Sequence, residues 1–454
     1  MAFRKTGRIS VAFTAALTAS LALGACSSSS SGGSGGTNTA INTPECADYK
    51  IYGDHTGTSV SIYTSIIAPE DQQHKQSYAL YEKCTGTKIN YEGSKEFEAQ
   101  LVVRVKSGNP PDIAFLPQPG LLQTLVNDTG KVLPAPAETA ANVDKWFGKD
   151  WKGYGSVNGT FYAAPLGANV KSFVWYSPTM FKKNNWAIPT TWDDMLKLSD
   201  TIAATGIKPW CAGFGSGDAT GWPGTDWVED VMLRTAGPDV YDQWIAHKIP
   251  FNDPKVIAAF DKVGQILKND KYVNGGLGDV KSIATTTFQD GGIPITTGKC
   301  AMHRQASFYA SNWPKGTKIA VDGDIFAFYL PPIDPAFGKP VEGGGEFVAA
   351  FANRPEVTSF QTFLSSDTWA NTKAKLGNWV SANKGVLLAN YNDPINALSA
   401  KILQDTTATF RFDASDLMPS AVGAGSFWKG MTAWITGQST TDTVNAIEAS
   451  WPKS

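Results

Sequence analysis

Residues 59–64 read SVSIYT and residues 111–115 read PDIAF. The first stretch alternates polar and apolar side chains, which predicts a short strand, and the second predicts another strand. The elements expected around them are a helix over 72–84, a strand over 88–91, a helix over 97–106 and a short helix over 121–126. Strands that alternate with helices at this spacing imply βαβ units and a mostly parallel sheet.

The rest of the chain reads as longer helices and shows no internal repeat. The Gly-rich stretch over 338–345 predicts a loop that returns to a sheet. The helices expected are 192–204, 226–235, 254–268, 355–364 and 441–448.

The amino terminus has the pattern of an export signal. Arg4, Lys5 and Arg8 precede an apolar segment over 11–23, which predicts a signal peptide over 1–25. The sequence Leu-Gly-Ala-Cys that ends at Cys26 resembles the bacterial lipobox, in which the Cys is lipidated and becomes the first mature residue. We therefore expect a lipidated Cys26 and a flexible Ser/Gly-rich tether over 26–57. An ordinary signal peptide cleaved after residue 25 is the alternative.

Charge and length restrict the possible partners. Removal of the signal leaves 429 residues with 36 Lys and Arg against 41 Asp and Glu, a net charge of about −5. A mildly acidic protein is a poor candidate for nucleic acid or an anionic surface. The length fits two domains, and no later apolar run is long enough to span a bilayer. The expected location is the extracytoplasmic face of the cell membrane, held there by the lipid.

The remaining four cysteines suit an exported protein. They are Cys46, Cys84, Cys211 and Cys300. An even number indicates two disulfides, for which three pairings exist. A zinc site is the alternative, but the chain has no CxxC or HxxxH spacing, so no metal is expected.

Aromatic side chains are plentiful, with 15 Trp, 14 Tyr and 23 Phe. Several Trp stand among polar, Gly or Pro residues, as in GWPGTDW over 221–227 and GSFWKG over 425–430. Aromatic faces stack on the CH face of a sugar, while nearby carboxylates and amides bind its hydroxyls. For any single Trp, a cap on the core is an equally good interpretation.

Six motifs in order carry a family resemblance over the chain from about residue 58. They are SVSIYTS, PDIAF, GTFYAAPLGANVKSFVWYSPTMF, GKCAMHRQASF, GGGEFVAAF and LMPSAVGAGSFWKGMTAWITG. Together they resemble the extracellular solute-binding proteins of ABC sugar importers, the family typified by maltose-binding protein, and are similar to its actinobacterial alpha-glucoside-binding members.

The resemblance implies an α/β periplasmic-binding-protein fold with two lobes, crossing strands and a ligand cleft between the lobes. Lobe one is expected over 58–166 plus 333–395, and lobe two over 167–332 plus 396–454. The favoured pairing, Cys46–Cys84 and Cys211–Cys300, then gives each lobe one bridge. The implied partners are a small sugar and the transmembrane subunits of an ABC permease. No cofactor is implied, and a monomer is expected.

The resemblance also implies ligand-binding residues. Trp428 and Phe308 stand at stacking positions. Polar contacts are expected from Ser65, Gln118 and Asn169, backbone approach from Gly345, and a hydrogen-bond acceptor from Glu346.

The remaining candidates are less specific. Trp222, Asp226 and Trp227 are candidates for a rim. Arg411 and Asp413 are either a hydroxyl clamp or a structural ion pair, and His303 and Arg304 are undecided between the same kinds of role. Leu116 stands where the family has an aromatic residue, which indicates a sugar shorter than a maltodextrin. Because the expected lining is aromatic and amide, we expect a neutral mono- to trisaccharide.

Enzyme motifs are missing from the sequence. The chain has no nucleophile elbow, P-loop or dinucleotide fingerprint after a strand, so no enzyme is expected. An exported glycoside hydrolase stays an alternative, because two of its 41 acidic residues would suffice. A binding protein for a non-sugar solute, such as a peptide or a polyamine, is a nearer alternative.

Overall fold

The computed structural model describes residues 38–403, 405 and 407–453. The predicted signal peptide and Cys26 lie outside the described residues. Within the described part of the chain, every helix is too short or too polar to cross a membrane.

The first body, called lobe one, is built on a five-stranded sheet in the order β2-β1-β3-β13-β6. Its strands are β1 (Ser59–Thr64), β2 (Lys88–Gly93), β3 (Ile113–Leu116), β6 (Ala163–Pro165) and β13 (Phe347–Ala350). Strand β1 runs parallel to both β2 and β3, which confirms the predicted βαβ units, whereas β13 runs antiparallel to β3 and β6.

The second body, lobe two, is built on a four-stranded sheet in the order β11-β8-β10-β9. Its strands are β8 (Phe173–Tyr176), β9 (Lys208–Trp210), β10 (Cys300–Arg304) and β11 (Phe326–Tyr329). Strand β10 is parallel to β9 and antiparallel to β8.

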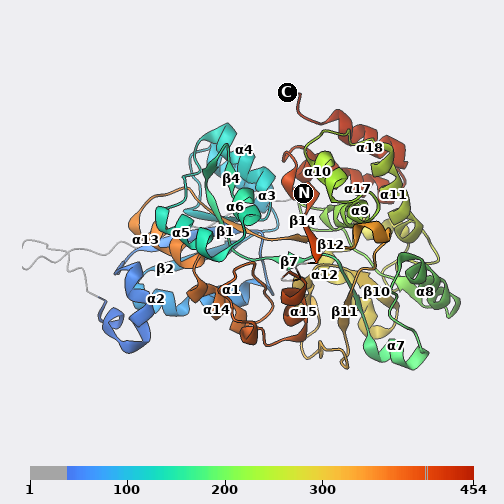
Figure 1. The fold of residues 1–454 in the computed structure, drawn as a ribbon, viewed down its shortest axis with the longest axis horizontal. Helices are drawn as coiled ribbons and strands as arrows, with labels where there is room; N and C mark the ends of the chain where they lie inside the picture. The colour runs from blue at the N-terminus through green and yellow to red at the C-terminus, as the bar shows by residue number, and fades with distance from the viewer. Residues whose placement is uncertain (1–37, 404, 406, 454) are drawn as a thin grey trace, which may run out of the picture. The chain divides into compact units, whose positions relative to one another are not determined.

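A third sheet joins the two lobes. Its order is β14-β12-β7, with β7 (Asn169–Val170), β12 (Lys339–Gly344) and β14 (Ala408–Phe412), and it lies between the other two sheets in Figure 1. The Gly-rich stretch predicted as a loop is therefore strand β12. Glycine is needed there because a Cβ at Gly343 would stand 2.5 Å from the Asn169 carbonyl oxygen of the neighbouring strand. The precise lobe boundaries given above stay a prediction.

Helices cover both sheets (Figure 1). Those of lobe one are α1 (Asp71–Ser77), α2 (Ala79–Thr85), α3 (Phe97–Lys106), α4 (Pro119–Thr129), α5 (Ala137–Trp146), α6 (Lys149–Tyr154), α13 (Pro355–Leu364) and α14 (Asp367–Lys375). Those of lobe two are α7 (Pro178–Asn184), α8 (Trp192–Ala204), α9 (Trp222–Thr235), α10 (Pro238–Ile245), α11 (Pro254–Leu267), α12 (Phe288–Gly291), α16 (Ala414–Leu417), α17 (Trp428–Thr436) and α18 (Thr440–Ala449).

The remaining elements are shorter or lie at the crossing. Helix α15 (Pro394–Leu403) packs against β7 and β14. A small hairpin pairs β4 (Ser156–Val157) with β5 (Thr160–Phe161). The 3-10 helices include η1 (Thr39–Asn42), η2 (Pro44–Tyr52), η3 (Val280–Ala284) and η5 (Ser307–Asn312), and a π-helix, η8 (Val422–Phe427), precedes α17.

Most helix predictions agree with the structure. Helices α3, α8 and α13 begin and end where the sequence predicted. The single helix predicted over 72–84 is two helices, α1 and α2, on either side of Tyr78. Helix α9 begins at Trp222, four residues before the predicted start, with Pro223 in its first turn where a missing N–H costs nothing.

The segment before β1 belongs to lobe one, which corrects the predicted length of the tether. Helix η2 buries Cys46, Tyr49 and Tyr52. The Tyr52 ring packs edge-on against Phe363, with ring centroids 5.3 Å apart. Asn38 donates hydrogen bonds to the backbone oxygens of Lys83 and Cys84. Because these contacts tie residues from 38 onward to the fold, a flexible tether does not extend to residue 57.

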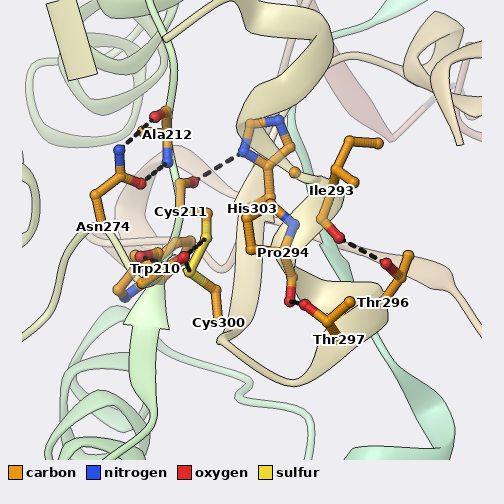
Figure 2. Close-up of a disulfide and its surroundings, with 12 residues drawn as sticks. Trp210, Cys211, Ala212, Asn274, Ile293, Pro294, Thr296, Thr297, Cys300 and His303 are labelled. Atoms are coloured by element: carbon orange, nitrogen blue, oxygen red, sulfur yellow. Dashed lines mark hydrogen bonds between the residues drawn. A yellow bond between two sulfur atoms is a disulfide. The ribbon is translucent and has the colours of Figure 1, made fainter. Parts of the chain in front are cut away.

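Both predicted disulfides are present. Cys46 of η2 is bonded to Cys84 of α2. Cys211, which follows β9, is bonded to Cys300, the first residue of β10. Figure 2 shows the second bridge beside His303, whose Nδ1–H donates to the Cys211 backbone oxygen at 2.9 Å. Burial lowers the pKa of His303 to about 4, so this undecided residue is a neutral part of the core of lobe two.

Removal of the first bridge should destabilise lobe one without changing the cleft. The bridge closes a loop of 38 residues, and such bridges contribute about 2–4 kcal/mol. We expect the Cys46→Ala/Cys84→Ala variant to lose that much free energy of unfolding in a urea titration. If the variant and the wild-type protein have the same free energy of unfolding in urea, the contribution assigned to the bridge is contradicted.

Candidate functional site

A cavity of about 170 Å³ lies between lobe one and lobe two, with Asn169 of β7 and Gly344 of β12 in its wall. Pockets that hold drug-sized ligands are typically about 300–1,000 Å³. The smaller volume indicates a small solute.

Lobe one lines the cavity with the segments that follow its parallel strands. Ser65, Ile66, Ile67 and Glu70 follow β1, Ser94, Lys95 and Glu98 follow β2, and Pro117 and Gln118 follow β3. Glu346 joins them because it precedes β13, whose first residue pairs with Leu116 at the end of β3. The crevice outside the carboxyl ends of parallel strands is where α/β sheets bind ligands, and the cavity lies there.

This wall carries three glutamates that form no ion pair among the described residues. Burial raises the pKa of Glu70 to about 8, that of Glu98 to about 7, and that of Glu346 above its usual range. Glu98 accepts a hydrogen bond from Gln118 Nε2 at 3.0 Å. Because their pKa values are raised, these carboxyl groups can accept hydrogen bonds from a ligand and, when protonated, also donate one.

Lobe two supplies an aromatic wall. Trp222, Phe288 and Phe308 pack against one another, with ring centroids 5.0–6.4 Å apart, and all three line the cavity. Trp428, at the start of α17, lines it too. A Cβ at Gly221, whose φ is +117°, would overlap the Trp428 backbone, so glycine is what allows the two tryptophan segments to approach.

Several buried polar atoms of the lining have no partner among the described residues. Gln118 Oε1 and Asn169 Oδ1 are acceptors, and Trp428 Nε1 is a donor. A buried polar group without a partner costs free energy, so these atoms are available to hydrogen-bond a polar ligand.

Lys171 forms the centre of a buried ionic cluster beside the cavity. Its Nζ contacts Asp226 Oδ1 at 3.0 Å and also Asp413 Oδ2, and the three side chains are at most 7% exposed. Burial alone would lower the pKa of Lys171, but the two carboxylates hold it well above its usual value. Burial likewise opposes ionisation of Asp413, but Lys171 lowers the pKa of that carboxyl to about 2.

Arg304 of β10 extends the cluster. Its guanidinium contacts Glu342 of β12, Asp230 Oδ2 at 3.0 Å and Asp226 Oδ2 at 3.5 Å. Carboxylate oxygens of Asp226, Glu342 and Asp413 lie within 4.8 Å of one another, and the cations beside them are Lys171 and Arg304. Arg304 is therefore a structural cation in this arrangement.

The structure brings nine of the twelve predicted ligand-binding residues to the cavity wall. They are Ser65, Gln118, Asn169, Trp222, Phe308, Gly345, Glu346, Asp413 and Trp428. That they bind a ligand stays a prediction. Beside the aromatic and amide side chains, five carboxyl groups and two lysines line the cavity.

The other three residues do not line the cavity. Asp226 is fully buried against Lys171, and Trp227 is 2% exposed in the core of lobe two. Arg411 pairs with Asp242 at 2.8 Å instead of with Asp413. Asp413 follows the end of β14 and caps α16 by accepting from the Asp416 N–H, so Arg411 and Asp413 form no ion pair with each other. Of the expected rim, only Trp222 stands at the cavity.

Sequence reasoning missed several lining residues. Glu70 and Glu98 follow predicted strands. Because ligands bind beside the carboxyl ends of parallel strands, both residues could have been predicted to line the cavity. The residues that surround Lys171 and Asp416 come from segments far apart in the sequence, so no local pattern identifies these two residues. Phe288 begins the short helix α12, which no sequence signal predicted.

Two α/β lobes, three connecting strands and a polar–aromatic cavity between the lobes define a two-lobed solute-binding protein. The family model of the bacterial extracellular solute-binding proteins matches residues 57–371, and the chain belongs to that family.

Two relatives match the chain over nearly its whole length. The osmoprotective compounds-binding protein GgtB of Synechocystis sp. is 38% identical over 411 residues, which cover 90% of this chain and 96% of that protein. The alpha-glucosides-binding periplasmic protein AglE of Rhizobium meliloti is 35% identical over 435 residues, 92% of each chain.

Solved structures agree with the fold. The bacterial solute receptor AcbH, described with a preference for β-D-galactopyranose, has a TM-score of 0.72 at 18% identity, over 87% of this chain and 97% of its own. The maltose-bound MalE3 of T. maritima has a TM-score of 0.68 at 16% identity, over 86% of this chain and 98% of its own. At such identities the likeness concerns the fold alone.

Removal of the Lys171 charge should destabilise the protein strongly. Lys171→Met leaves two buried carboxylates short of a cation, and breaking a buried pair costs about 3–5 kcal/mol. Arg411→Met is the matched control, because that pair is 28% and 50% exposed and such pairs contribute about 0–1 kcal/mol. Urea titrations at pH 7 measure both, and equal losses would contradict the role of the buried cluster.

Proposed function

We propose that this protein is the substrate-binding lipoprotein of an ABC importer, which captures an alpha-glucoside and delivers it to a membrane permease. The observation that carries the proposal is the cavity between the lobes, where an aromatic wall on lobe two faces carboxyl and amide groups on lobe one. In the proposed cycle the lobes close on the sugar, as hinged binding proteins do.

The hydrogen-bonding groups of the cavity favour a ligand rich in donors. Glu70, Glu98, Glu346 and Asp416 form no ion pair among the described residues, and Gln118 and Asn169 add unpartnered acceptors. A sugar presents many hydroxyl donors to such acceptors and a CH face to Trp222, Phe308 or Trp428.

The choice of an alpha-glucoside is supported by the relative AglE, whose printed name gives that ligand class. The relative GgtB is named for osmoprotective compounds instead, so its name alone does not favour the alpha-glucoside class. The small volume of the cavity is consistent with a mono- or disaccharide.

One observation favours a second candidate. Four carboxyl groups without ion pairs, opposite a group of aromatic rings, also suit a polyamine, because cations bind carboxylates and aromatic faces. Glucosides carry no charge, so the two candidates differ in how their binding responds to salt.

Thermal unfolding with a panel of solutes tests the proposal. The panel comprises methyl α-D-glucoside, maltose, trehalose, sucrose, galactose, glucose 6-phosphate and spermidine. A bound solute at 100 times its dissociation constant adds about 2.7 kcal/mol to the free energy of unfolding. We expect stabilisation by at least one alpha-glucoside. Stabilisation by spermidine alone would replace the proposal with the second candidate, and release of reducing sugar from maltose would indicate a hydrolase.

Trp428 should contribute strongly to binding. It lines the cavity, is 3% exposed and stands outside the apolar clusters of the two lobes. If Trp428 is an aromatic hot spot, Trp428→Ala should weaken the free energy of binding by more than about 2 kcal/mol. Calorimetry should then give a dissociation constant roughly thirtyfold higher.

Two variants serve as controls for Trp428. Trp428→Phe retains a stacking face and should lose less affinity than Trp428→Ala. Trp434→Ala, on the same helix but in the core, should lower stability by about 3–5 kcal/mol instead. A Trp428→Ala variant with wild-type affinity, or one that fails to fold, would show that Trp428 does not form the binding surface.

The lipid anchor is part of the proposal. Cys26 ends a lipobox-like sequence, and modification of that Cys would hold the protein at the extracytoplasmic membrane surface. We expect Cys26→Ala to release folded protein from the membrane fraction into the medium or periplasm, as measured by fractionation. Protein that stays with the membrane after this substitution would rule out the anchor.

A further inference from the structure

One hydrogen bond joins the two lobes at the edge of the cavity without involving a ligand. Asp218 of lobe two accepts from the backbone N–H of Ala99 in lobe one, with Oδ2 and N 2.9 Å apart. Ala99 is the third residue of α3, and this helix has no capping hydrogen bond from its own N-cap residue, Glu96. The Asp218 carboxylate therefore takes the place of an N-cap side chain, but from the opposite lobe.

The loop that carries Asp218 is fixed to lobe two. Gly215 donates its N–H to the Thr286 carbonyl oxygen, and Phe288 donates to that of Gly215. The internal turn of the loop uses the Thr220 hydroxyl, which accepts from the Ser216 N–H at 3.0 Å and donates to the Gly217 carbonyl oxygen. In the described structure the Asp218 carboxylate accepts its one well-formed hydrogen bond from Ala99, while the nearby N–H groups of Asp218 and Ala219 only lower its pKa.

The loop also approaches lobe one closely. Gly217 has a φ of +63°, and a Cβ at this residue would stand 2.6 Å from the Lys95 carbonyl oxygen. Lys95, Glu98 and Gly217 all line the cavity. The contact between Asp218 and Ala99 therefore lies where the two lobes meet beside the cavity.

A second bond between the lobes is longer. Asn312 Nδ2 of lobe two stands 3.4 Å from Glu70 Oε1 of lobe one. This distance is at the limit for a hydrogen bond, so Asp218 makes the stronger of these two side-chain contacts.

We propose that Asp218 is a positioning residue that stabilises the closed arrangement of the lobes by capping α3 across the cleft. The lobes are connected by the segments of β7, β12 and β14, and a hinge motion about them would separate Asp218 from Ala99. Water would then solvate both groups, and α3 would lose its cap. The contact therefore favours closure, and it slows release of a bound solute without touching that solute.

A cross-link tests whether the two residues meet in solution. We expect the double variant Ala99→Cys/Asp218→Cys to form a disulfide under mild oxidation without any added solute, because closure is reversible. Peptide mass mapping identifies the linked pair among the native cysteines. The pair Ala99→Cys/Asp279→Cys is the negative control, because Asp279 binds Ser282 within lobe two. If neither pair cross-links, the proposed contact is overturned.

The predicted effect of Asp218 on solute dissociation rests on the proposed function, and maltose and trehalose serve as probes. Asp218→Ala should raise the dissociation constant about five- to tenfold, through faster dissociation measured by stopped-flow Trp fluorescence. Asp218→Asn retains an acceptor and should lose less. Asp279→Ala removes a carboxylate–backbone bond of the same kind inside one lobe and should leave dissociation unchanged.

The outcomes separate the two proposals. Wild-type dissociation rates in Asp218→Ala, or equal effects of Asp218→Ala and Asp279→Ala, would overturn the role of Asp218. If the wild-type protein binds neither sugar, the proposed function is contradicted for these ligands, and the cross-link still decides whether the contact between the lobes exists.

Discussion

The attachment of the crossing strands to lobe two depends on the contact of the Lys171 ammonium with the carboxylates of Asp226 and Asp413. Lys171 follows β7, Asp413 follows β14, and β12 between them contributes Glu342 to the adjoining Arg304. Each of the three strands between the lobes thus places one charged side chain in the same buried cluster. Asp226 of α9 and Arg304 of β10 tie that cluster to lobe two, so the crossing sheet is held to one lobe by interactions that are expensive to break.

The cavity combines two different surfaces because the lobes present different parts of their folds. Lobe one offers the ends of parallel strands, where loops carry Glu70, Glu98 and Gln118. Lobe two offers the first residues of α9, α12 and α17, where Trp222 follows Gly221, Phe288 follows Thr287 and Trp428 follows the π-helix η8. Polar groups with spare acceptors therefore face aromatic rings, which is the chemistry that the proposed function uses.

Much of the fold could be predicted from the sequence, because its signals are local. The alternation in SVSIYT and the periodicity of 97–106 identify β1 and α3, and the ordered motifs identified the family and both disulfides.

The prediction of a loop over 338–345 was wrong. Paired glycines usually indicate a loop, whereas here they allow close packing of the crossing strands. Trp222 and Trp227 were both expected at the rim because both stand in GWPGTDW. Since both lie on α9, five residues separate them by roughly 140°, and only one can face the cavity. The partners of Lys171 lie 55 and 242 positions away, a distance over which no local pattern operates.

The interactions at the crossing and those across the cleft differ in strength, and this difference is what a capture cycle needs. Breaking a pair in the buried cluster costs about 3–5 kcal/mol, so the cluster should survive any movement of the lobes. The contacts across the cleft, Asp218 to Ala99 and Asn312 to Glu70, are single hydrogen bonds to groups that water can reach when the lobes part, each worth about 1 kcal/mol. Contacts of that size bias closure without locking it, so the free energy of solute binding can decide which arrangement predominates. If the cross-cleft contacts were as strong as the cluster around Lys171, the lobes would stay closed without a solute, and the protein could neither admit its ligand nor release it.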